Sequence, residues 1–578
     1  MISQEQLNIS NIRHSLAHIL AMAVLNKFPK SQLGIGPVIE HGFYYDIKLP
    51  RPLSDDELKE LEKSMRDLIV QKLIFKGEKI TPQKARSLFK HQPFKLDLIK
   101  EFIKEKRQLT VYRTGTFIDL CRGGHIKNTS EINPDAFKLT TIAGAYWRGD
   151  EKNAQLTRIY GIAFAAKEEL EKHLAFLEEA KRRDHKRLGV ELDLFTFSDL
   201  VGSGLPLWTP KGTIMRNILD SYVWKLRKAA GYEQVDIPHI TKKDLYETSG
   251  HWEKFKNELF NITTREGHLF VMKPMNCPHH TQIYSRKQFS YRELPQRYAS
   301  TTKVYRDEQS GELSGLSRVR AITQDDAHVF CRHTQVKEEI LKIWDIISEF
   351  YGKVGFALSV RLSLHDPKKF KNYLGTPGTW KQAEAQLRGV IKEKGASVYE
   401  GIGEAAFYGP KIDFMAHDSI GREWQVATIQ LDMNMPERFD LACINEKGER
   451  EQVVMIHAAI MGSIERYLSI LIEHYAGAFP LWLAPVQVAV LTVTDAAKNY
   501  AHEVLHALGE YGMRVIIDDR NETIGKKIRD QEIQKIPYVL VIGGREAEAK
   551  TVAVRERGKG NLGSMTMEDF LKRLQSYP

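Results

Sequence analysis

The stretch Thr301–Arg332 gathers polar side chains that could bind a charged substrate. Its sequence, TTKVYRDEQSGELSGLSRVRAITQDDAHVFCR, predicts two strands joined by a Gly/Ser loop over residues 309–317. Because strand side chains alternate between faces, Arg306 and Glu308 share a face of the first strand. On the second strand, one face carries Arg318, Gln324, Asp326 and His328. Arginines, an acid and an imidazole suit a substrate with phosphates, a carboxylate and an amine, although a solvated edge hairpin would show the same polar face.

Two short pairs of residues that bind metals or protons recur near the N-terminus. His14 and His18 are four residues apart in RHSLAHILAMAVLNKF, so they occupy one face of a predicted helix. Cys121 and His125 follow in TGTFIDLCRGGHIKN, where Asp119 precedes the cysteine on a strand. Three imidazoles and a thiol form a possible zinc quartet. They could equally form a metal-free hydrolytic pocket that orients a water, and the first pair alone could be ordinary helix-surface residues.

Length and composition are those of a soluble multidomain protein. At 578 residues the chain is too long for one core, and 42% hydrophobic with 27% charged residues is typical of globular proteins. Neither a membrane-spanning apolar run nor a secretion signal is apparent in the sequence. Four scattered cysteines favour a reducing compartment, so we expect a cytoplasmic protein. The net charge of +10 is compatible with a polyanionic partner but does not establish one.

The predicted elements divide the chain into four parts and indicate a multidomain α+β and α/β fold. These are a mixed α/β part (1–165), a linker helix closed by Gly189 (166–189), the largest part (190–480) and a small α/β domain with a largely parallel sheet (481–578). The basic run Lys181–Arg187 is either a solvated helix face or a contact for nucleic-acid phosphates.

In the largest part, a long helix over residues 213–230 could serve a dimer seam or simply the core. The segment VVMIHAAIMGSIERYLSILIEHY predicts a strand, Gly462 and an apolar helix that carries Arg466. A lone buried charge is costly, so an anionic ligand would supply the partner that this arginine needs.

Several of these segments resemble the motifs of class II aminoacyl-tRNA synthetases. YRDE, the loop and RVRAITQDDAHVF resemble motif 2, GYEQVDIP resembles the end of motif 1, and GSIERYL resembles motif 3. KPMNCP, QDDAH and MIHAAIMGS together resemble the threonyl-tRNA synthetases. The N-terminal His and Cys pairs resemble the editing domain of that family, and the C-terminal part its anticodon-binding domain. The resemblance implies a class II catalytic domain with an antiparallel sheet, in a homodimer that ligates L-threonine to tRNA(Thr) through threonyl-adenylate with ATP.

The same resemblance implies that Cys277, His328 and His457 hold one Zn²⁺. Three protein ligands leave an open coordination position, as in a substrate-binding site. Threonine can offer an amino group and a hydroxyl to the metal, whereas valine lacks the hydroxyl. The residues expected to complete the threonine pocket are Gln324, Asp326, Tyr408 and Gln425.

For activation, the resemblance assigns Arg306 to the carboxylate and the α-phosphate. Arg466 and Arg318 would hold the ATP phosphates, Glu308 the adenine or its ribose, and Mg²⁺ would accompany ATP. His251 is expected near the terminal ribose of the tRNA, where it could assist transfer.

A second site is expected because serine keeps the hydroxyl and loses only a methyl, a difference of about 1–3 kcal/mol. By resemblance, seryl-tRNA would be hydrolysed by His14, His18, Lys95, Asp119, Cys121 and His125. Whether these residues bind a metal stays open, and a metal-free pocket is favoured because hydrolysis needs only an oriented water. Anticodon contacts are expected at Asn521, Arg529, Glu546 and Arg555.

The sequence also departs from the family pattern. The ubiquitin-like leader of many relatives is expected to be missing. In HAAI, which begins at His457, an alanine stands where an arginine commonly follows the histidine. CPHH stands where the family usually has CPGH. Two other functions fit in part: an RNA-binding protein without ligase activity, and a synthetase for serine or proline. Retention of Arg306, Arg318 and Arg466 speaks against a pure binding protein.

Overall fold

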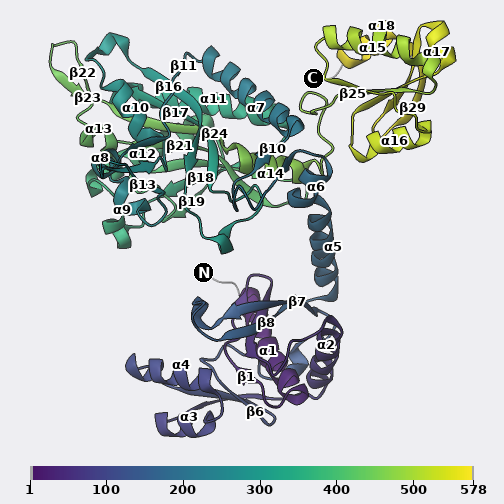
Figure 1. Cartoon of the computed structure of the whole chain (residues 1–578). Coiled ribbons are helices and arrows are strands. Elements are labelled where there is room, and N and C mark those ends of the chain that lie inside the picture. The colour runs from purple at the N-terminus through teal and green to yellow at the C-terminus, as the bar shows by residue number, and fades with distance from the viewer. Residues whose placement is uncertain (1–3, 576–578) are drawn as a thin grey trace. The chain divides into compact units, whose positions relative to one another are not determined.

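The computed structural model describes residues 4–575 of the chain (Figure 1). These residues divide into two compact units, one that ends at Glu178 and one that begins at Glu179. The predicted boundaries at residues 165, 189 and 480 stay predictions.

The first unit contains two antiparallel sheets. The larger has the order β1-β3-β8-β7, with β2 paired to β3, and the smaller has the order β4-β5-β6. The strands are β1 (Gln32–Leu33), β2 (Val38–Ile39), β3 (Gly42–Lys48), β4 (Phe75–Lys79), β5 (Thr110–Thr114), β6 (Phe117–Leu120), β7 (Phe137–Tyr146) and β8 (Gln155–Ala163).

Helix α1 (Gln4–Lys27) carries the histidine pair into the core of this unit. Leu16, Ala17 and Leu20 have no exposed surface, and the helix packs against β3 and α2 (Asp55–Val70). Helix α2 begins at Ser54, which forms a capping box with Glu57 as the S-x-x-E spacing favours. Two short helices, α3 (Pro82–Leu88) and α4 (Pro93–Lys104), complete the unit. Because α1 is buried on most sides, His18 cannot be an ordinary surface residue.

The single linker helix predicted over residues 166–189 is wrong. The structure has two helices, α5 (Lys167–Arg183) and α6 (His185–Glu191). Asp184 separates them because its extended backbone and its side chain, which accepts the Lys186 N–H, make it the N-cap of α6. Gly189 lies inside α6, where the Phe195 ring packs directly against it and leaves no room for a side chain. This glycine serves packing and does not end the helix.

The second unit is built on an eight-stranded sheet with the order β11-β16-β17-β24-β21-β20-β18-β19. Its pairs are antiparallel except at the two edges, where β11 is parallel to β16 and β19 to β18, so the expected antiparallel sheet is confirmed. The strands are β11 (Glu233–Gln234), β16 (Gln296–Tyr305), β17 (Ala321–Cys331), β18 (Ala357–Leu364), β19 (Val398–Ile402), β20 (Lys411–His417), β21 (Glu423–Asp432) and β24 (Val454–Ser463).

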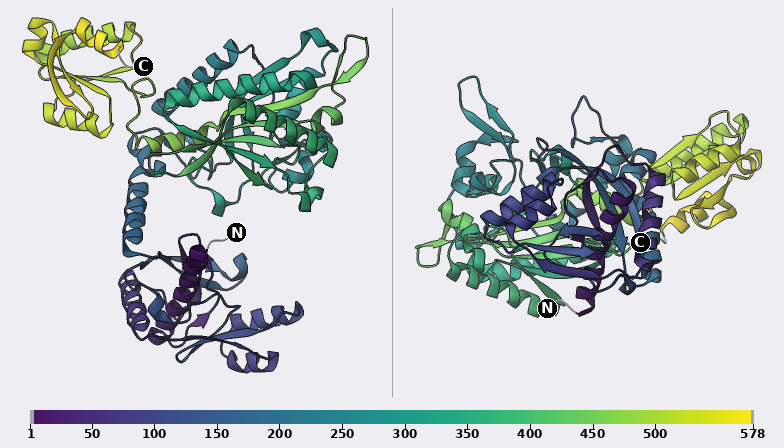
Figure 2. Two further views of the ribbon diagram at one scale, coloured as in Figure 1. Left: turned by 180° about the vertical axis from the view of Figure 1, so that it is seen from behind. Right: turned by 90° about the horizontal axis from the view of Figure 1, so that it is seen from below.

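Long helices and the sheet share one large apolar core (Figure 2). They are α7 (Pro210–Ala229), α11 (Val336–Val354), α12 (Pro377–Lys394) and α14 (Ile464–His474). Alternation along β17 sends Ala327 and Val329 into this core, which leaves His328 on the opposite face. Helix α7 contributes Met215 and Leu219 to the same core, which gives it a core role within one copy of the chain.

Smaller elements complete the second unit. The strands are β9 (Phe195–Thr196), β10 (Leu207–Trp208), β12 (Ile240–Lys242), β13 (Asn261–Thr263), β14 (Leu269–Met272), β15 (Phe289–Ser290), β22 (Ala442–Ile444) and β23 (Arg450–Gln452). The helices are α8 (Lys243–Ser249), α9 (His251–Phe255), α10 (Cys277–Tyr284) and α13 (Asn434–Arg438).

The C-terminal part forms a five-stranded sheet with the order β26-β25-β27-β28-β29. Its strands are β25 (Val488–Thr492), β26 (Val515–Asp518), β27 (Tyr538–Ile542), β28 (Thr551–Glu556) and β29 (Gly560–Thr566), and its helices are α15 (Lys498–Glu510), α16 (Ile524–Ile533), α17 (Gly544–Ala549) and α18 (Met567–Gln575). Strands β26, β25 and β27 are parallel, whereas β28 and β29 add antiparallel pairs. The prediction of a largely parallel sheet is therefore only half right.

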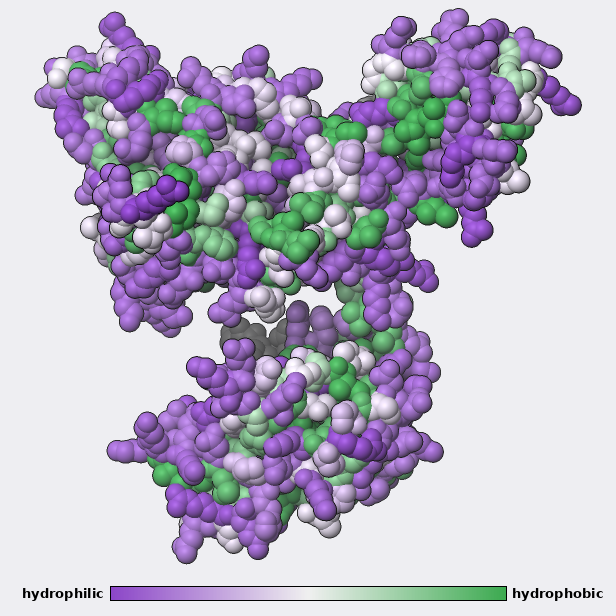
Figure 3. All heavy atoms as spheres, viewed as in Figure 1, coloured by the Kyte–Doolittle hydropathy of each residue, from purple (hydrophilic) through white to green (hydrophobic). Residues whose placement is uncertain are grey.

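The face of the molecule in Figure 3 is mostly hydrophilic, with scattered apolar side chains. Among residues 4–575, each helix is too short or too polar to cross a membrane.

Candidate functional site

A cavity of about 690 Å³ lies on the polar face of the central sheet. Its walls come from β17, β21, β24, the start of α14 and the segment that joins β16 to β17. Six of the predicted substrate-binding residues line it: Arg306, Glu308, Arg318, Gln324, Gln425 and Arg466. The polar residues of the hairpin therefore line an open cavity and are not simply a solvated edge.

The strands of the hairpin are shorter than the alternation predicted. Strand β16 ends at Tyr305 and β17 begins at Ala321, so Arg306, Glu308 and Arg318 lie on the connecting segment and not on strand faces. The Arg306 N–H still donates to the Arg320 carbonyl at 3.0 Å, which holds the base of this segment together. The segment, and not strand alternation, brings these side chains to the cavity.

The arginines of the cavity differ in how they are paired. Arg318 is bound to the Glu308 carboxylate, with Nη2 and Oε2 2.7 Å apart. Within residues 4–575, the Arg306 guanidinium donates only to the Met275 sulfur, at 3.4 Å; it lies over the Phe255 ring, and burial lowers its pKa. Its Nε has no partner among the described residues.

The structure corrects the expectation that Arg466 is a buried charge. Its backbone N–H is capped by Ser463, while its side chain is exposed at the cavity and has no hydrogen-bond or ion-pair partner in the described part of the chain. An incompletely paired Arg306 and an open Arg466 favour an anionic ligand in this cavity.

The amino-acid pocket residues lie on neighbouring strands. Asp326 is nearly buried and accepts a hydrogen bond from Asn276 Nδ2 at 3.2 Å. Gln425 is held from two sides, by Arg361 Nη2 and by the Asp413 carboxylate. Tyr408 stacks on His457 with ring centroids 4.8 Å apart and donates to Gln430. Gln430 was not predicted, although a polar residue among the apolar positions of β21 is a signal that could have found it.

Cys277, His328 and His457 come together as predicted, and all three are buried. Cys277 begins α10, while the two histidines are directly opposed across β17 and β24. Their potential ligand atoms lie within 4.8 Å of one another. His328 Nε2 is buried without a hydrogen-bond partner, and burial lowers the His328 pKa well below its usual value.

Further groups hold the two imidazoles in place. His280 Nδ1 lies 2.8 Å from His328 Nδ1, and the Asp432 carboxylate lies 3.1 Å from His457 Nε2. Such outer partners fix the ring orientation of metal-ligating histidines. An unpartnered buried nitrogen, a thiol and a second imidazole are a donor set that suits zinc.

His251 is not among the residues that line the cavity. It is fully buried, with Nδ1 2.9 Å from Ser249 Oγ and Nε2 3.5 Å from the Cys277 sulfur. Burial lowers its pKa to about 3. The structure therefore brings His251 beside the cysteine of the predicted zinc trio and not to an open surface.

A buried ion pair supports the site from behind. Asp325 accepts hydrogen bonds from Ile460 N at 2.8 Å and Met461 N at 3.1 Å, and from Arg227 of α7. Burial raises its pKa to about 6. Asp325 thus faces away from its neighbour Asp326 and ties β17 to β24, a role that the QDD sequence does not reveal.

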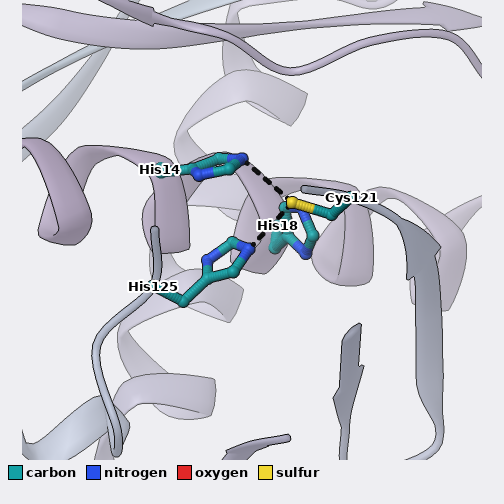
Figure 4. A group of neighbouring side chains, drawn as sticks. All are labelled: His14, His18, Cys121 and His125. Atoms are coloured by element: carbon teal, nitrogen blue, oxygen red, sulfur yellow. Dashed lines mark hydrogen bonds between the residues drawn. The ribbon is translucent and has the colours of Figure 1, made fainter. Parts of the chain in front are cut away.

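The predicted N-terminal pocket is also assembled (Figure 4). The Cys121 sulfur lies 3.4 Å from His14 Nε2 and 3.2 Å from His125 Nε2. The rings of His14 and His125 stack with centroids 4.1 Å apart, and His18 lies edge-on to both. The turn that delivers His125 uses Gly123 and Gly124, both with positive φ.

The two remaining predicted editing residues, Lys95 and Asp119, form a buried pair 2.5 Å apart. Asp119 also accepts from the Tyr45 hydroxyl and lies 3.6 Å from His18 Nε2. Ser15 Oγ lies 3.1 Å from His125 Nδ1. Tyr45 and Ser15 were not predicted because, in sequence, an aromatic residue on a strand and a serine on a helix look structural.

Burial keeps this pocket neutral. It raises the pKa of Cys121 to about 11 and lowers the pKa of His125 to about 2. The pKa of His18 is also lowered well below its usual value. At neutral pH the group is a thiol and uncharged imidazoles, a set of proton acceptors that can orient water.

The predicted anticodon contacts are not brought into one cluster. Asn521 precedes α16, Arg529 is exposed on α16, and Arg555 on β28 reaches Glu532 of the same helix. Glu546 instead accepts the Gly543 N–H at 3.0 Å at the start of α17. This is a helix-capping contact, and the anticodon role of Glu546 stays a prediction.

Three family models match the chain. The tRNA synthetase class II core domain (G, H, P, S and T) matches residues 256–475 and the anticodon binding domain matches residues 487–577. The threonyl and alanyl tRNA synthetase second additional domain matches residues 109–160, which include Cys121 and His125.

Individual proteins agree with these models. The threonine–tRNA ligase of Gloeobacter violaceus is 48% identical over 98% of this chain and 92% of that protein. The threonine–tRNA ligase of Cytophaga hutchinsonii is 47% identical over 98% of this chain and 88% of that protein. The solved RNA binding domain of threonyl-tRNA synthetase from Cryptosporidium parvum superposes with a TM-score of 0.65 at 37% identity, over 68% of this chain and 99% of that one. High identity over nearly the full length, together with the core, additional and anticodon domain matches, shows that the chain belongs to the threonine–tRNA ligases, a family of class II aminoacyl-tRNA synthetases.

Proposed function

We propose that this ligase selects threonine with a zinc ion held by Cys277, His328 and His457 and removes misattached serine in the N-terminal pocket. The observation that carries the first part is the unpartnered His328 Nε2 beside Cys277 and His457. The observation that carries the second is the neutral cluster around Cys121.

Activation follows from the charges around the cavity. ATP enters with Mg²⁺, and the threonine carboxylate attacks the α-phosphorus so that pyrophosphate leaves. Arg306 is placed to hold the carboxylate and the α-phosphate, because its guanidinium lacks a carboxylate partner within hydrogen-bonding distance. Arg466 and Arg318 hold the outer phosphates, and Glu308 fixes Arg318 while contacting the nucleoside. A hydroxyl of the tRNA's terminal ribose then attacks the carbonyl and AMP leaves.

Cys277, His328 and His457 would hold the zinc. Bound there, zinc would take the amino and hydroxyl groups of threonine as its further ligands. Asp326 lies 3.8 Å from His328 and would orient the threonine hydroxyl by accepting a hydrogen bond from it, while Gln324 and Gln425 flank the pocket. A site that must bind a hydroxyl rejects valine strongly, as an apolar pocket cannot.

In the N-terminal pocket, the imidazole of His14 accepts a proton from a water that attacks the seryl ester, while His125, whose pKa is lowered to about 2, only accepts a hydrogen bond from that water. Lys95, Asp119 and Tyr45 form a buried network that orients His18. Both ester products, free serine and intact tRNA, result from this single hydrolysis.

Amino-acid-dependent exchange between ATP and pyrophosphate tests the first proposal, with a metal count on the same preparation. We expect exchange with threonine, about one zinc per chain, and no exchange with proline or valine. Valine as good as threonine would refute selection by zinc. No exchange with threonine would favour an RNA-binding protein.

Four features stay predictions. They are the homodimer, the cytoplasmic location, the transfer role of His251, and the anticodon contacts of Asn521, Arg529, Glu546 and Arg555.

A further inference from the structure

The junction between α5 and α6 contacts two segments that each carry a residue of the central cavity wall, Arg466 on α14 and Arg318 before β17, although the proposed reaction does not use the junction. The junction residues are Arg183, Asp184 and His185. His185 is buried, with only 4% of its surface exposed. A buried imidazole outside the reacting groups calls for a physical reason.

Both nitrogens of His185 are occupied. Nδ1 lies 2.6 Å from the Glu473 carboxylate, and Nε2 lies 3.1 Å from the Leu316 backbone N–H. A backbone N–H can only donate, so Nε2 accepts, and Nδ1 carries the proton that it donates to Glu473. Asp184, His185 and Glu473 could form a metal cluster by spacing, but His185 has no free lone pair to offer.

On one side, the junction contacts the C-terminal end of α14, the helix that carries Arg466 in its first turn. Glu473 is also paired with Arg422 at 2.6 Å. Arg183 donates to the carbonyls of Glu473 and His474, at 3.3 and 2.9 Å, and to Ser419. These contacts satisfy carbonyls at a helix C-terminus and place positive charge there, which stabilises the helix end.

On the other side, His185 holds a turn of the segment that joins β16 to β17. The turn is closed by the Ser314 N–H, which donates to the Arg318 carbonyl at 3.1 Å, and Leu316 at its centre is fully buried. Gly315 has a positive φ of 51°, and a side chain there would meet the His185 ring. Arg318, at the end of the turn, points its guanidinium to Glu308 at the cavity wall.

We infer that His185 is a positioning residue for ATP binding. It ties the Ser314–Arg318 turn to the end of α14, so that Arg318 and Arg466 are held on walls of one cavity. This inference rests on the proposed role of these two arginines in binding ATP phosphates. Without the tie, the Leu316 N–H would be buried and unpaired, and the turn would relax away from the cavity.

Two conservative variants separate the two hydrogen bonds of His185. In His185→Asn the side-chain amide can still donate to Glu473 but does not reach Leu316. In His185→Gln the longer amide can still accept from Leu316. We expect His185→Asn to raise the KM for ATP in the exchange assay about 5- to 30-fold. This fold-change lies within the range expected when a buried hydrogen-bond donor is left unpaired. The KM for threonine and the zinc content should stay within about 2-fold, and His185→Gln should restore most of the ATP affinity.

The thermal midpoint of each variant and the effect of Arg318→Ala complete the test. A lower midpoint and lower kcat with an unchanged KM for ATP would show a structural role only and overturn the inference, as would equal KM values in the Asn and Gln variants. If Arg318→Ala raises the KM for ATP but His185→Asn does not, the tie is wrong and the proposed ATP site stands. If neither Arg318→Ala nor Arg466→Ala changes it, the proposed ATP site itself is wrong.

Should His185→Asn fail to fold, Gly315→Ala presses on the same contact from the turn. Its added methyl would push against the His185 ring, and we expect the same rise in the KM for ATP with an unchanged KM for threonine. An unchanged KM for ATP in a folded Gly315→Ala protein would overturn the inference.

Discussion

The two His/Cys clusters of this chain contain the same residue types but differ in how far they are buried. In the N-terminal pocket, the Cys121 thiol hydrogen-bonds to two of the imidazoles, and His14, Cys121 and His125 are only partly buried. In the central trio, all three residues are buried. Each cluster holds one buried imidazole nitrogen without a hydrogen-bond partner among the described residues, His18 Nδ1 in the first and His328 Nε2 in the second, so the clusters differ in burial. A partly buried cluster admits water and suits hydrolysis, whereas a fully buried thiol and two imidazoles suit a metal. Residue types alone therefore do not distinguish a hydrolytic site from a metal site.

The largest expected effect comes from removing a ligand of the central trio. We expect Cys277→Ala to contain no zinc by elemental analysis and to lose threonine-dependent exchange. Cys443→Ala is the matched control, because Cys443 is equally buried but belongs to neither cluster. Full activity with retained metal in Cys277→Ala would show that the ligand set is wrong.

The corresponding change in the N-terminal pocket should leave activation untouched. We expect the double variant Cys121→Ala, His14→Ala to charge threonine normally but to clear seryl-tRNA about 10²- to 10⁴-fold more slowly, the usual contribution of proton-transfer groups. Deacylation of isolated seryl-tRNA measures this directly. Unchanged clearance would remove the hydrolytic assignment, and zinc lost from the N-terminal pocket together with the activity would favour the metal quartet instead.

An outer partner should have a smaller effect than a ligand. His280→Ala removes the group that orients His328 and should weaken zinc binding about 10- to 100-fold, as measured by competition with a chelator. Ser15→Ala removes the comparable partner of His125 and should leave the zinc content unchanged. Equal metal loss in both variants would contradict the contrast between the clusters.

The smallest expected effect is a pH profile without an inflection. Burial holds the pKa of His125 at about 2, so lowering the pH from 8 to 6 does not protonate it. Seryl-tRNA deacylation should therefore show no titration with a midpoint near 6.5, the ordinary value for histidine. A midpoint there would mean that the imidazoles are hydrated and ionisable when tRNA is bound.

Local patterns predicted much of both sites. The i, i+4 spacing of His14 and His18 was sufficient to place both imidazoles on one helix face. The resemblance correctly brought Cys277, His328 and His457 together, although their meeting depends on strand register that no local pattern specifies. Alternation failed for Arg306 and Glu308, because β16 ends at Tyr305, before both of them.

Other functional positions gave no readable signal. Asp325 and Asp326 are adjacent and identical in type, and only the tertiary fold sends one to Arg227 and the other to Asn276. Tyr45 resembles any buried aromatic on a strand until its hydroxyl is seen to donate to Asp119. Gly189 was misread because a helix-ending glycine and a glycine chosen for close packing look the same in sequence.

The pairing of β17 with β24 is irregular between Gln324 and Asp326, and there the Asp325 carboxylate captures two successive amides of β24. A slip of one residue would turn either strand over and send its histidine into the apolar core, so this carboxylate works as a latch against sliding. The Asp325 carboxylate is held by Arg227 and two backbone N–H groups and not by a metal ion. A chelator should therefore remove zinc from Cys277, His328 and His457 without unfolding the surrounding sheet, in contrast to small domains that fold only when they bind their metal.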